Sequence, residues 1–162
     1  RIAMIYEGAN GIQALDLVGR KLPRDGGRAV MSFFGEVMGY CKDHGGDEAM
    51  KPFVAPLSNA LGHLQQATTW LMQNAMAKPD NAGAAATDYL QLFGFVTLGY
   101  MWARMAKVAV DKIAASGETA YLKTKLVTGR FFMERMLPET ALHLARIQTG
   151  CDTTMELAAE AF

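Results

Sequence analysis

The sequence has 162 residues, of which 51% are hydrophobic and 20% are charged, and its 16 basic residues balance its 16 acidic residues. A chain of this length and composition can bury one compact hydrophobic core. The basic residues are dispersed without a basic stripe, which argues against a nucleic-acid partner, and no apolar run is long enough to cross a bilayer.

The two cysteines, Cys41 and Cys151, lie far apart in the sequence. A single disulfide between them is possible. Because isolated cysteines are more typical of reduced compartments, we expect free thiols and a cytoplasmic protein.

A short motif, Ile5-Tyr6-Glu7-Gly8-Ala9-Asn10-Gly11-Ile12-Gln13, stands near the start of the chain. Asn10 can cap a following helix, and Gln13, three residues later, can reach back to the cap amide as in a capping box. This places Glu7 just before the first helical turn, and Gly8 allows the main chain to turn there or to lie flat against a ligand. On local chemistry alone, a solvated loop acid near a helix N-terminus is the simpler interpretation.

The first helix is expected over residues 10–20, with Ile12, Leu15 and Val18 on its apolar face. The turn-rich segment 23–27, Pro-Arg-Asp-Gly-Gly, ends it and predicts a linker. A second helix is expected over about 26–44, where Gly45-Gly46 stops it. Its apolar face comprises Val30, Phe34, Val37 and Cys41.

Two long helices follow, over about 50–75 and 82–115, and both show apolar residues at alternating steps of three and four. In the first, these positions are Met50, Val54, Leu57, Leu61, Leu64, Thr68, Leu71 and Ala75. In the second, they are Tyr89, Leu92, Val96, Gly99, Ala103, Ala106, Val110 and Ile113. The small residues in the second series should let a neighbouring helix approach closely.

A fifth helix is expected from Glu118 toward Ile147, with Pro138 kinking or splitting it near residues 134–138. Its seam comprises Leu122, Leu126, Gly129, Phe132 and Met136. A short last helix is expected over 153–161. Because no segment shows the period-two alternation of strands, the sequence predicts an all-α protein, an up-down helical bundle of long antiparallel helices.

Residues 5–22 resemble the end of the catalytic domain of acyl-CoA dehydrogenases, and in particular a bacterial branch of that family with an extra C-terminal helical domain. Residues 129–138, Gly-Arg-Phe-Phe-Met-Glu-Arg-Met-Leu-Pro, resemble a segment of the extra domain. The resemblance implies a remnant of the catalytic domain over residues 1–22 and the helical-bundle domain over residues 23–162. We therefore expect the chain to be a C-terminal piece of a longer enzyme.

The same resemblance implies that Glu7 is the catalytic base that removes a proton from the carbon next to the thioester carbonyl. It also implies that the backbone amide of Glu7 helps to hold the thioester oxygen, and that Tyr6 and Gly8 belong to the substrate-binding site. Ala9 and Gly11 stand where the wider family contacts FAD. Gly11 agrees with the bacterial branch, whereas Ala9 replaces a usual threonine, so one hydroxyl contact to the flavin is expected to be absent.

For the longer enzyme, the resemblance implies FAD as cofactor, an acyl-CoA thioester as substrate, an electron-transfer flavoprotein as acceptor, and a homodimer or tetramer. We expect the 162-residue chain alone to be inactive and free of flavin. The alternative is a helical docking or oligomerisation module with no catalytic role. Membrane attachment is not expected, because the balanced charge offers no basic amphipathic face.

Other candidate sites are weaker. Glu139 and His143 can share a helix face, but the chain has no Glu-x-x-His pair of the kind that builds a metal centre in a bundle, so no metal site is expected. The eleven methionines are either an adaptable binding groove or core filler, and their helical spacing favours the core. Trp70 and Trp102 are expected as core or interface anchors.

Overall fold

The structure is a computed structural model that describes residue 2 and residues 9–161. Its helices are α2 (Ala9–Asp16), α3 (Arg28–His44), α4 (Lys51–Asn74), α5 (Asp80–Ser116), α6 (Ala120–Phe131), α7 (Glu139–Thr149) and α8 (Asp152–Met155). Shorter turns of other helix types are η1 (Leu17–Lys21), η2 (Arg24–Gly27), η3 (Phe132–Met136) and η4 (Ala159–Ala161). The described part of the chain contains no strand, and the predicted all-α bundle is confirmed.

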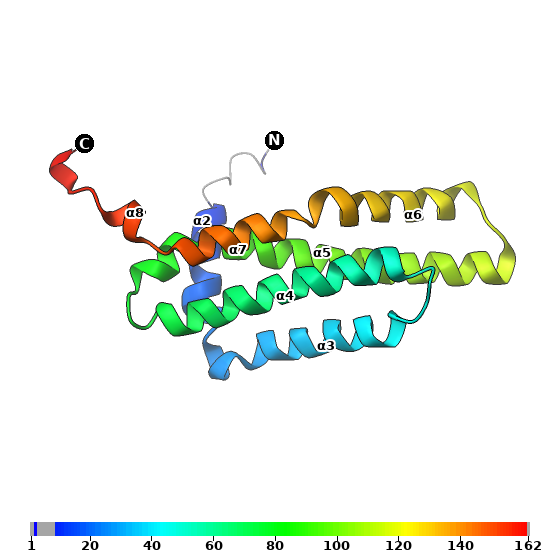
Figure 1. Ribbon diagram of the computed structural model, residues 1–162, viewed down its shortest axis with the longest axis horizontal. Coiled ribbons are helices and arrows are strands. Elements are labelled where there is room, and N and C mark those ends of the chain that lie inside the picture. The colour runs from blue at the N-terminus through cyan, green and yellow to red at the C-terminus, as the bar shows by residue number, and fades with distance from the viewer. Residues whose placement is uncertain (1, 3–8, 162) are drawn as a thin grey trace.

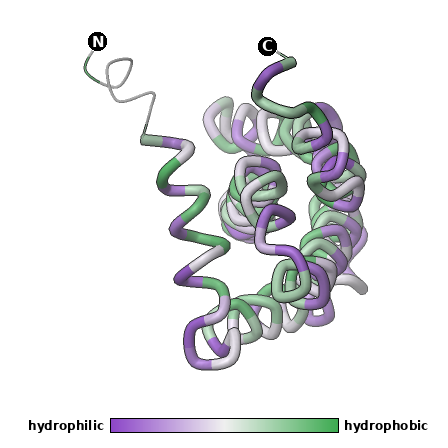
Figure 2. Tube along the Cα trace, turned by 90° about the vertical axis from the view of Figure 1, so that its left-hand side faces the viewer, coloured by the Kyte–Doolittle hydropathy of each residue, from purple (hydrophilic) through white to green (hydrophobic). Residues whose placement is uncertain are grey.

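The long helices lie side by side and alternate in direction (Figure 1). Helices α3, α4 and α5 form three antiparallel layers, and α6 and α7 follow one another back along α5. Helix α2 packs against α5 and crosses one end of this bundle, as the end-on view shows (Figure 2). At about 1.5 Å per residue, the 37 residues of α5 extend over about 55 Å, so this helix forms the spine of the molecule.

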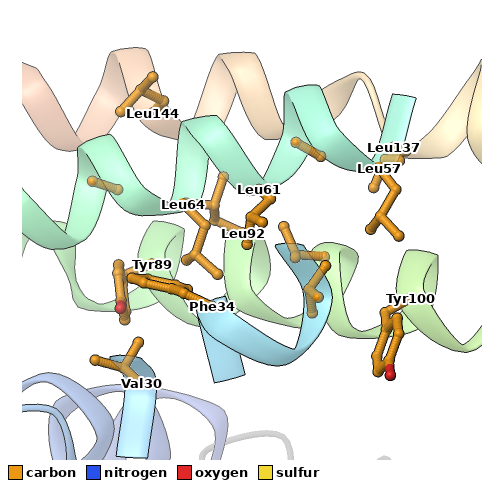
Figure 3. Close-up of a cluster of buried hydrophobic side chains, with 14 of the residues drawn as sticks. Val30, Phe34, Leu57, Leu61, Leu64, Tyr89, Leu92, Tyr100, Leu137 and Leu144 are labelled. Atoms are coloured by element: carbon orange, nitrogen blue, oxygen red, sulfur yellow. The ribbon is translucent and has the colours of Figure 1, made fainter. Parts of the chain in front are cut away.

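The predicted seams form the hydrophobic core. In α4, the seam positions from Met50 to Leu71 are buried, and on α5 the positions from Tyr89 to Ala106 are buried. Figure 3 shows Leu57, Leu61 and Leu64 of α4 between side chains of the neighbouring helices. The alternation of three and four residues therefore identified the inner face of both long helices correctly.

Glycines at two seam positions let helices approach closely, as the small residues of α5 predicted. A Cβ added at Gly99 of α5 would lie 3.2 Å from the Leu137 Cδ1 atom. A Cβ at Gly129 of α6 would lie 3.0 Å from the Phe53 Cε1 atom and 3.3 Å from the Trp102 Cε3 atom. These distances are shorter than most contacts of real Cβ atoms, so a larger residue at either position would require the neighbouring side chains to shift by a few tenths of an ångström.

The fifth predicted helix is indeed divided, but its inner face differs from the prediction. Residues Phe132–Met136 form a π turn, in which the Leu137 amide donates to the Phe132 carbonyl over 2.9 Å. A π turn holds one residue more than an α turn, so the following side chains rotate by one position. Met136, predicted in the seam, is therefore 38% exposed, and Leu137 is 1% exposed in its place.

Two further expectations are corrected. The last predicted helix, 153–161, is only the short α8 followed by the 3₁₀ turn η4. Its residues are all exposed, and a short helix without a buried face has little to stabilise it in water. The methionines are mostly not core filler, since these eight are exposed: Met31, Met38, Met72, Met76, Met101, Met105, Met136 and Met155.

Cys41 and Cys151 are buried free thiols. None of the helices in the described segments has both the length and the apolar character of a membrane span.

Candidate functional site

The predicted active-site motif leads directly into α2. Tyr6, Glu7 and Gly8 lie outside the described residues. Ala9 and Gly11 are in the first turns of α2, where Ala9 is half-buried and Gly11 is exposed. Among the described residues, a Cβ built at Gly11 would meet nothing within 4 Å.

Helix α2 is held by one narrow apolar face. Ala14, Val18 and Leu22 are buried in the common core, and the small Ala14 side chain lets α2 approach α5. The predicted face of this helix is therefore wrong in part, because Ile12 is 62% exposed and Leu15 is 48% exposed. Among the described residues, only one side of α2 has a neighbouring helix. The predicted apolar face is wider than this side, so Ile12 and Leu15 stay exposed.

A π turn and a left-handed turn direct the chain from α2 into the bundle. In the π turn η1, the Leu22 amide donates to the Leu17 carbonyl over 2.8 Å. Asp25, Gly26 and Gly27 then have φ angles of 52°, 66° and 78°, and this left-handed run reverses the chain before α3. The predicted linker is thus an ordered turn that fixes how α2 meets the bundle.

Ion pairs with Arg20 and Lys21 lower the pKa of Asp16 at the end of α2 to about 2. Arg20 and Lys21 are both exposed, so these ion pairs contribute little to the stability of the fold. They do neutralise the Asp16 carboxylate, which lies just before the π turn.

An apolar hollow of about 430 Å³ opens where the π turn η1 and the turn η2 meet the end of α4 and the start of α5. Its lining includes Val18, Leu22, Met72 and Met76, and none of the described residues that line it has a titratable side chain. This hollow can bind an apolar group, but it contains no group that could transfer a proton.

The histidines in the interior join helices. The Nδ1–H of His143 on α7 donates to Asp88 Oδ1 on α5 over 2.7 Å, and Arg146 approaches the same carboxylate at 3.6 Å. Glu139, which can share a helix face with His143, is exposed. No group of three or more metal-ligating side chains occurs within residues 9–161.

His63 makes a second link, between α4 and α7. The Thr140 hydroxyl donates to the Leu137 carbonyl over 2.8 Å, so it accepts from His63 Nδ1–H, which lies 3.0 Å away. Burial lowers the pKa of His63, because a cation is less stable away from water. Because the Thr140 hydroxyl donates its proton to a main-chain carbonyl, His63 does not act as a base toward it, and among the described residues both histidines serve to link helices.

A larger hollow, of about 550 Å³, lies between the second half of α5 and the start of α6. Among the described residues, no acidic residue lines this hollow. Three basic residues line it: Arg104, Lys112 and Lys125. Sequence analysis missed this cluster because its members come from two helices. One feature of the sequence could have indicated this surface. Leu98, Met101, Met105 and Val108 form a second apolar stripe at helical spacing on α5, outside the predicted seam.

Comparison with known proteins defines the class. The family model described as "Acetyl-CoA dehydrogenase C-terminal like" matches residues 33–158, which include all of the long helices apart from the first turn of α3. The chain belongs to this family of acyl-CoA dehydrogenase C-terminal domains.

Two relatives are similar over nearly the whole chain. The chain is 30% identical to the 3-methylmercaptopropionyl-CoA dehydrogenase of Ruegeria pomeroyi over 157 residues, covering 96% of this chain and 26% of that protein. It is 29% identical to the broad-specificity linear acyl-CoA dehydrogenase FadE5 of Mycobacterium tuberculosis over 171 residues, covering 100% of this chain and 28% of that protein. The chain thus spans about a quarter of the length of these relatives.

Proposed function

We propose that this chain is the C-terminal part of a flavin-dependent acyl-CoA dehydrogenase, in which it supplies the catalytic base Glu7. The observation that carries the proposal is the combination of two independent features. The helical bundle belongs to the family of acyl-CoA dehydrogenase C-terminal domains, and the Tyr6-Glu7-Gly8 motif stands immediately before it. The two relatives, whose names are those of acyl-CoA dehydrogenases, support the same conclusion.

The chemistry requires a base within hydrogen-bond reach of the proton next to the thioester carbonyl, and fixed donors for the enolate oxygen that develops. We propose that the Glu7 carboxylate is this base and that the Glu7 amide is one of the donors. FAD, when bound, accepts the hydride from the neighbouring carbon. Tyr6 would form a wall of the substrate pocket, and Gly8 would let the main chain lie against the thioester.

The described residues next to this motif fit a flavin nucleotide. Gly11 has no side chain, and none of the described residues lies within 4 Å of a Cβ built there, which supports an approach of the cofactor to the main chain. The methyl group of Ala9 offers no hydrogen bond, which is consistent with one fewer contact to the flavin. The buried Ala14 side chain anchors α2, the helix that follows the motif, to the bundle.

We further propose that the domain boundary lies between residues 22 and 23, that an electron-transfer flavoprotein is the acceptor, and that the enzyme is a cytoplasmic homodimer or tetramer. The 162-residue chain by itself should purify without flavin and turn over no thioester. A yellow preparation of this chain would contradict that expectation.

The test uses the longer polypeptide that contains this chain. The protein is mixed anaerobically with a panel of acyl-CoA thioesters, and bleaching of the flavin absorbance is followed for the wild type, Glu7→Gln and the control Glu118→Gln, an exposed residue at the far end of the bundle. We expect Glu7→Gln to bleach about 10³-fold more slowly with flavin still bound, and the control to be unchanged. Equal rates in all three proteins would show that the base lies elsewhere.

A further inference from the structure

The last described residues, 152–161, leave the bundle and are exposed throughout. They contain only the short helix α8 and the turn η4, and they extend beyond the long helices at the left of Figure 1. Two large apolar side chains lie in this segment, Met155 and Leu157, which are 59% and 61% exposed. In this position the segment gains almost nothing from burial of apolar surface.

The sequence of the same segment is strongly amphipathic. On a helix over residues 152–161, Asp152, Glu156 and Glu160 fall on one side at steps of four. Met155, Leu157 and the three alanines of the segment occupy the rest of the circumference. This pattern is typical of a helix that lies on an apolar surface, and a helix of about ten residues does not form in water without such a surface.

An apolar surface lies next to the start of this segment. A hollow of about 440 Å³ opens between the end of α2, the start of α5 and α8. Leu15 of α2 and Val18 of η1 line one side of it, and Thr154 and Met155 of α8 line another. Leu15 is 48% exposed, so the end of α2 offers apolar surface that the segment can cover.

The segment is attached to the bundle at one fixed point. Cys151 is buried, and its amide donates to the Asn81 Oδ1 atom of α5 over 3.0 Å. The next residue, Asp152, forms an ion pair with Lys78 at 2.5 Å. Because the residues beyond this point are all exposed, the segment can move about it without disturbing the core.

Charge favours movement of the segment toward α2. Residues 152–161 contain three acidic residues and no basic residue. Residues 9–28, which form α2 and the turns after it, contain two acidic residues, Asp16 and Asp25, and four basic residues: Arg20, Lys21, Arg24 and Arg28. Opposite net charges on neighbouring segments attract one another.

We propose that residues 152–161 are a strap that folds into one helix and closes over the end of α2. In the closed form, Met155 and the apolar side of the strap fill the hollow and cover Leu15. Glu156 and Glu160 stay in solvent, near the basic residues that follow α2. This conformational change does not depend on the role of Glu7.

The rest of a longer polypeptide is the competing occupant of this face of α2. Two observations favour the strap. Thr154 and Met155 already line the hollow together with Leu15, and the strap has the opposite net charge to the segment that it would cover.

The test measures hydrogen exchange in residues 9–22 and 152–161, both in the 162-residue chain and in the longer polypeptide that contains it. Leu15→Gln removes the apolar contact without adding a charge. Its matched control is Val127→Gln, an exposed apolar residue on α6. Ala158→Pro prevents the strap from forming a helix. Circular dichroism establishes that all variants are folded.

In both wild-type proteins, we expect residues 152–161 to exchange about tenfold more slowly than an unstructured chain. Leu15→Gln should abolish this protection, and Val127→Gln should leave it unchanged. Ala158→Pro should speed exchange in α2 as well, because the strap and α2 stabilise one another.

Three results would overturn the proposal. The first is exchange of residues 152–161 at the unstructured rate in the wild type, and the second is an equal effect of Leu15→Gln and Val127→Gln. The third is protection of α2 in the longer polypeptide that Ala158→Pro leaves unchanged, which would assign this face to the rest of the polypeptide.

Discussion

Polar side chains in the interior of the bundle join helices in pairs. Tyr100 donates to Glu36 over 2.9 Å and so connects α5 to α3, and His143 connects α7 to Asp88 of α5. Every buried side-chain nitrogen or oxygen of the described residues has a hydrogen-bond partner. Because an unpaired polar group would be costly in this environment, each pair favours one register of the helices over a shifted one.

His63 should make the stability of the bundle depend on pH. Burial lowers the pKa of His63 in the folded chain below its ordinary value, so the unfolded chain binds the proton more readily. The contribution of His63 is therefore complete above about pH 6.5 and is lost as the pH falls through the folded pKa. Urea unfolding between pH 7.5 and 5 should show a smaller decrease in unfolding free energy for His63→Gln than for the wild type.

The two proteins differ only at His63, so the difference between their curves reports on this residue alone. Parallel curves for the wild type and His63→Gln would contradict the lowered pKa of the half-buried His63.

The π turn at Phe132–Met136 decides which side of a helix faces the core. Up to Phe132, the buried positions are those of the predicted seam. After the turn, the buried position moves by one residue along the chain, so Leu137 replaces Met136 in the interior. Such a turn cannot be recognised from apolar spacing alone, because Met136 and Leu137 are both hydrophobic and adjacent.

Alanine substitutions test whether Leu137 or Met136 is the buried residue after the π turn. Leu137→Ala removes a buried side chain that packs against Gly99, and it should lower the unfolding free energy by about 2–5 kcal/mol. Met136→Ala changes an exposed residue and should cost no more than about 0.5 kcal/mol. The measurement is urea unfolding of both variants, and a larger loss for Met136→Ala would mean that the α-helical seam continues through this segment.

In the whole molecule, α2 shares the hydrophobic core of the long helices although it crosses their end. Ala14, Val18 and Leu22 belong to the same buried cluster as the seams of α4 and α5. The segment that follows the proposed active-site motif is therefore positioned by the bundle, and a disturbance at this contact should propagate to the orientation of the motif.

Ala14→Asp tests this dependence. A carboxylate at a fully buried position would have no partner, so α2 should detach while the rest of the bundle remains folded. Hydrogen exchange should then show loss of protection in residues 9–22 and little change in α4 and α5. The control Ile12→Asp, on the exposed side of α2, should exchange like the wild type. Cooperative loss of protection throughout the chain would show that α2 and the bundle form a single folding unit.

The sequence by itself determined the helical class, the long antiparallel helices and the inner faces of α4 and α5. These features depend on residues close in the chain: repeated apolar spacing, and glycine or proline at the breaks. It also supplied the motif that contains Glu7, whose part in catalysis stays a prediction.

Only the tertiary structure decided which side of α2 is buried, that Leu137 replaces Met136, and that Asp88 of α5 is the partner of His143. It also brought Arg104 and Lys125, from different helices, to the border of one hollow. Each of these outcomes depends on the distance between residues far apart in the chain, and that distance is set by how whole helices pack, which a local pattern of residues does not encode.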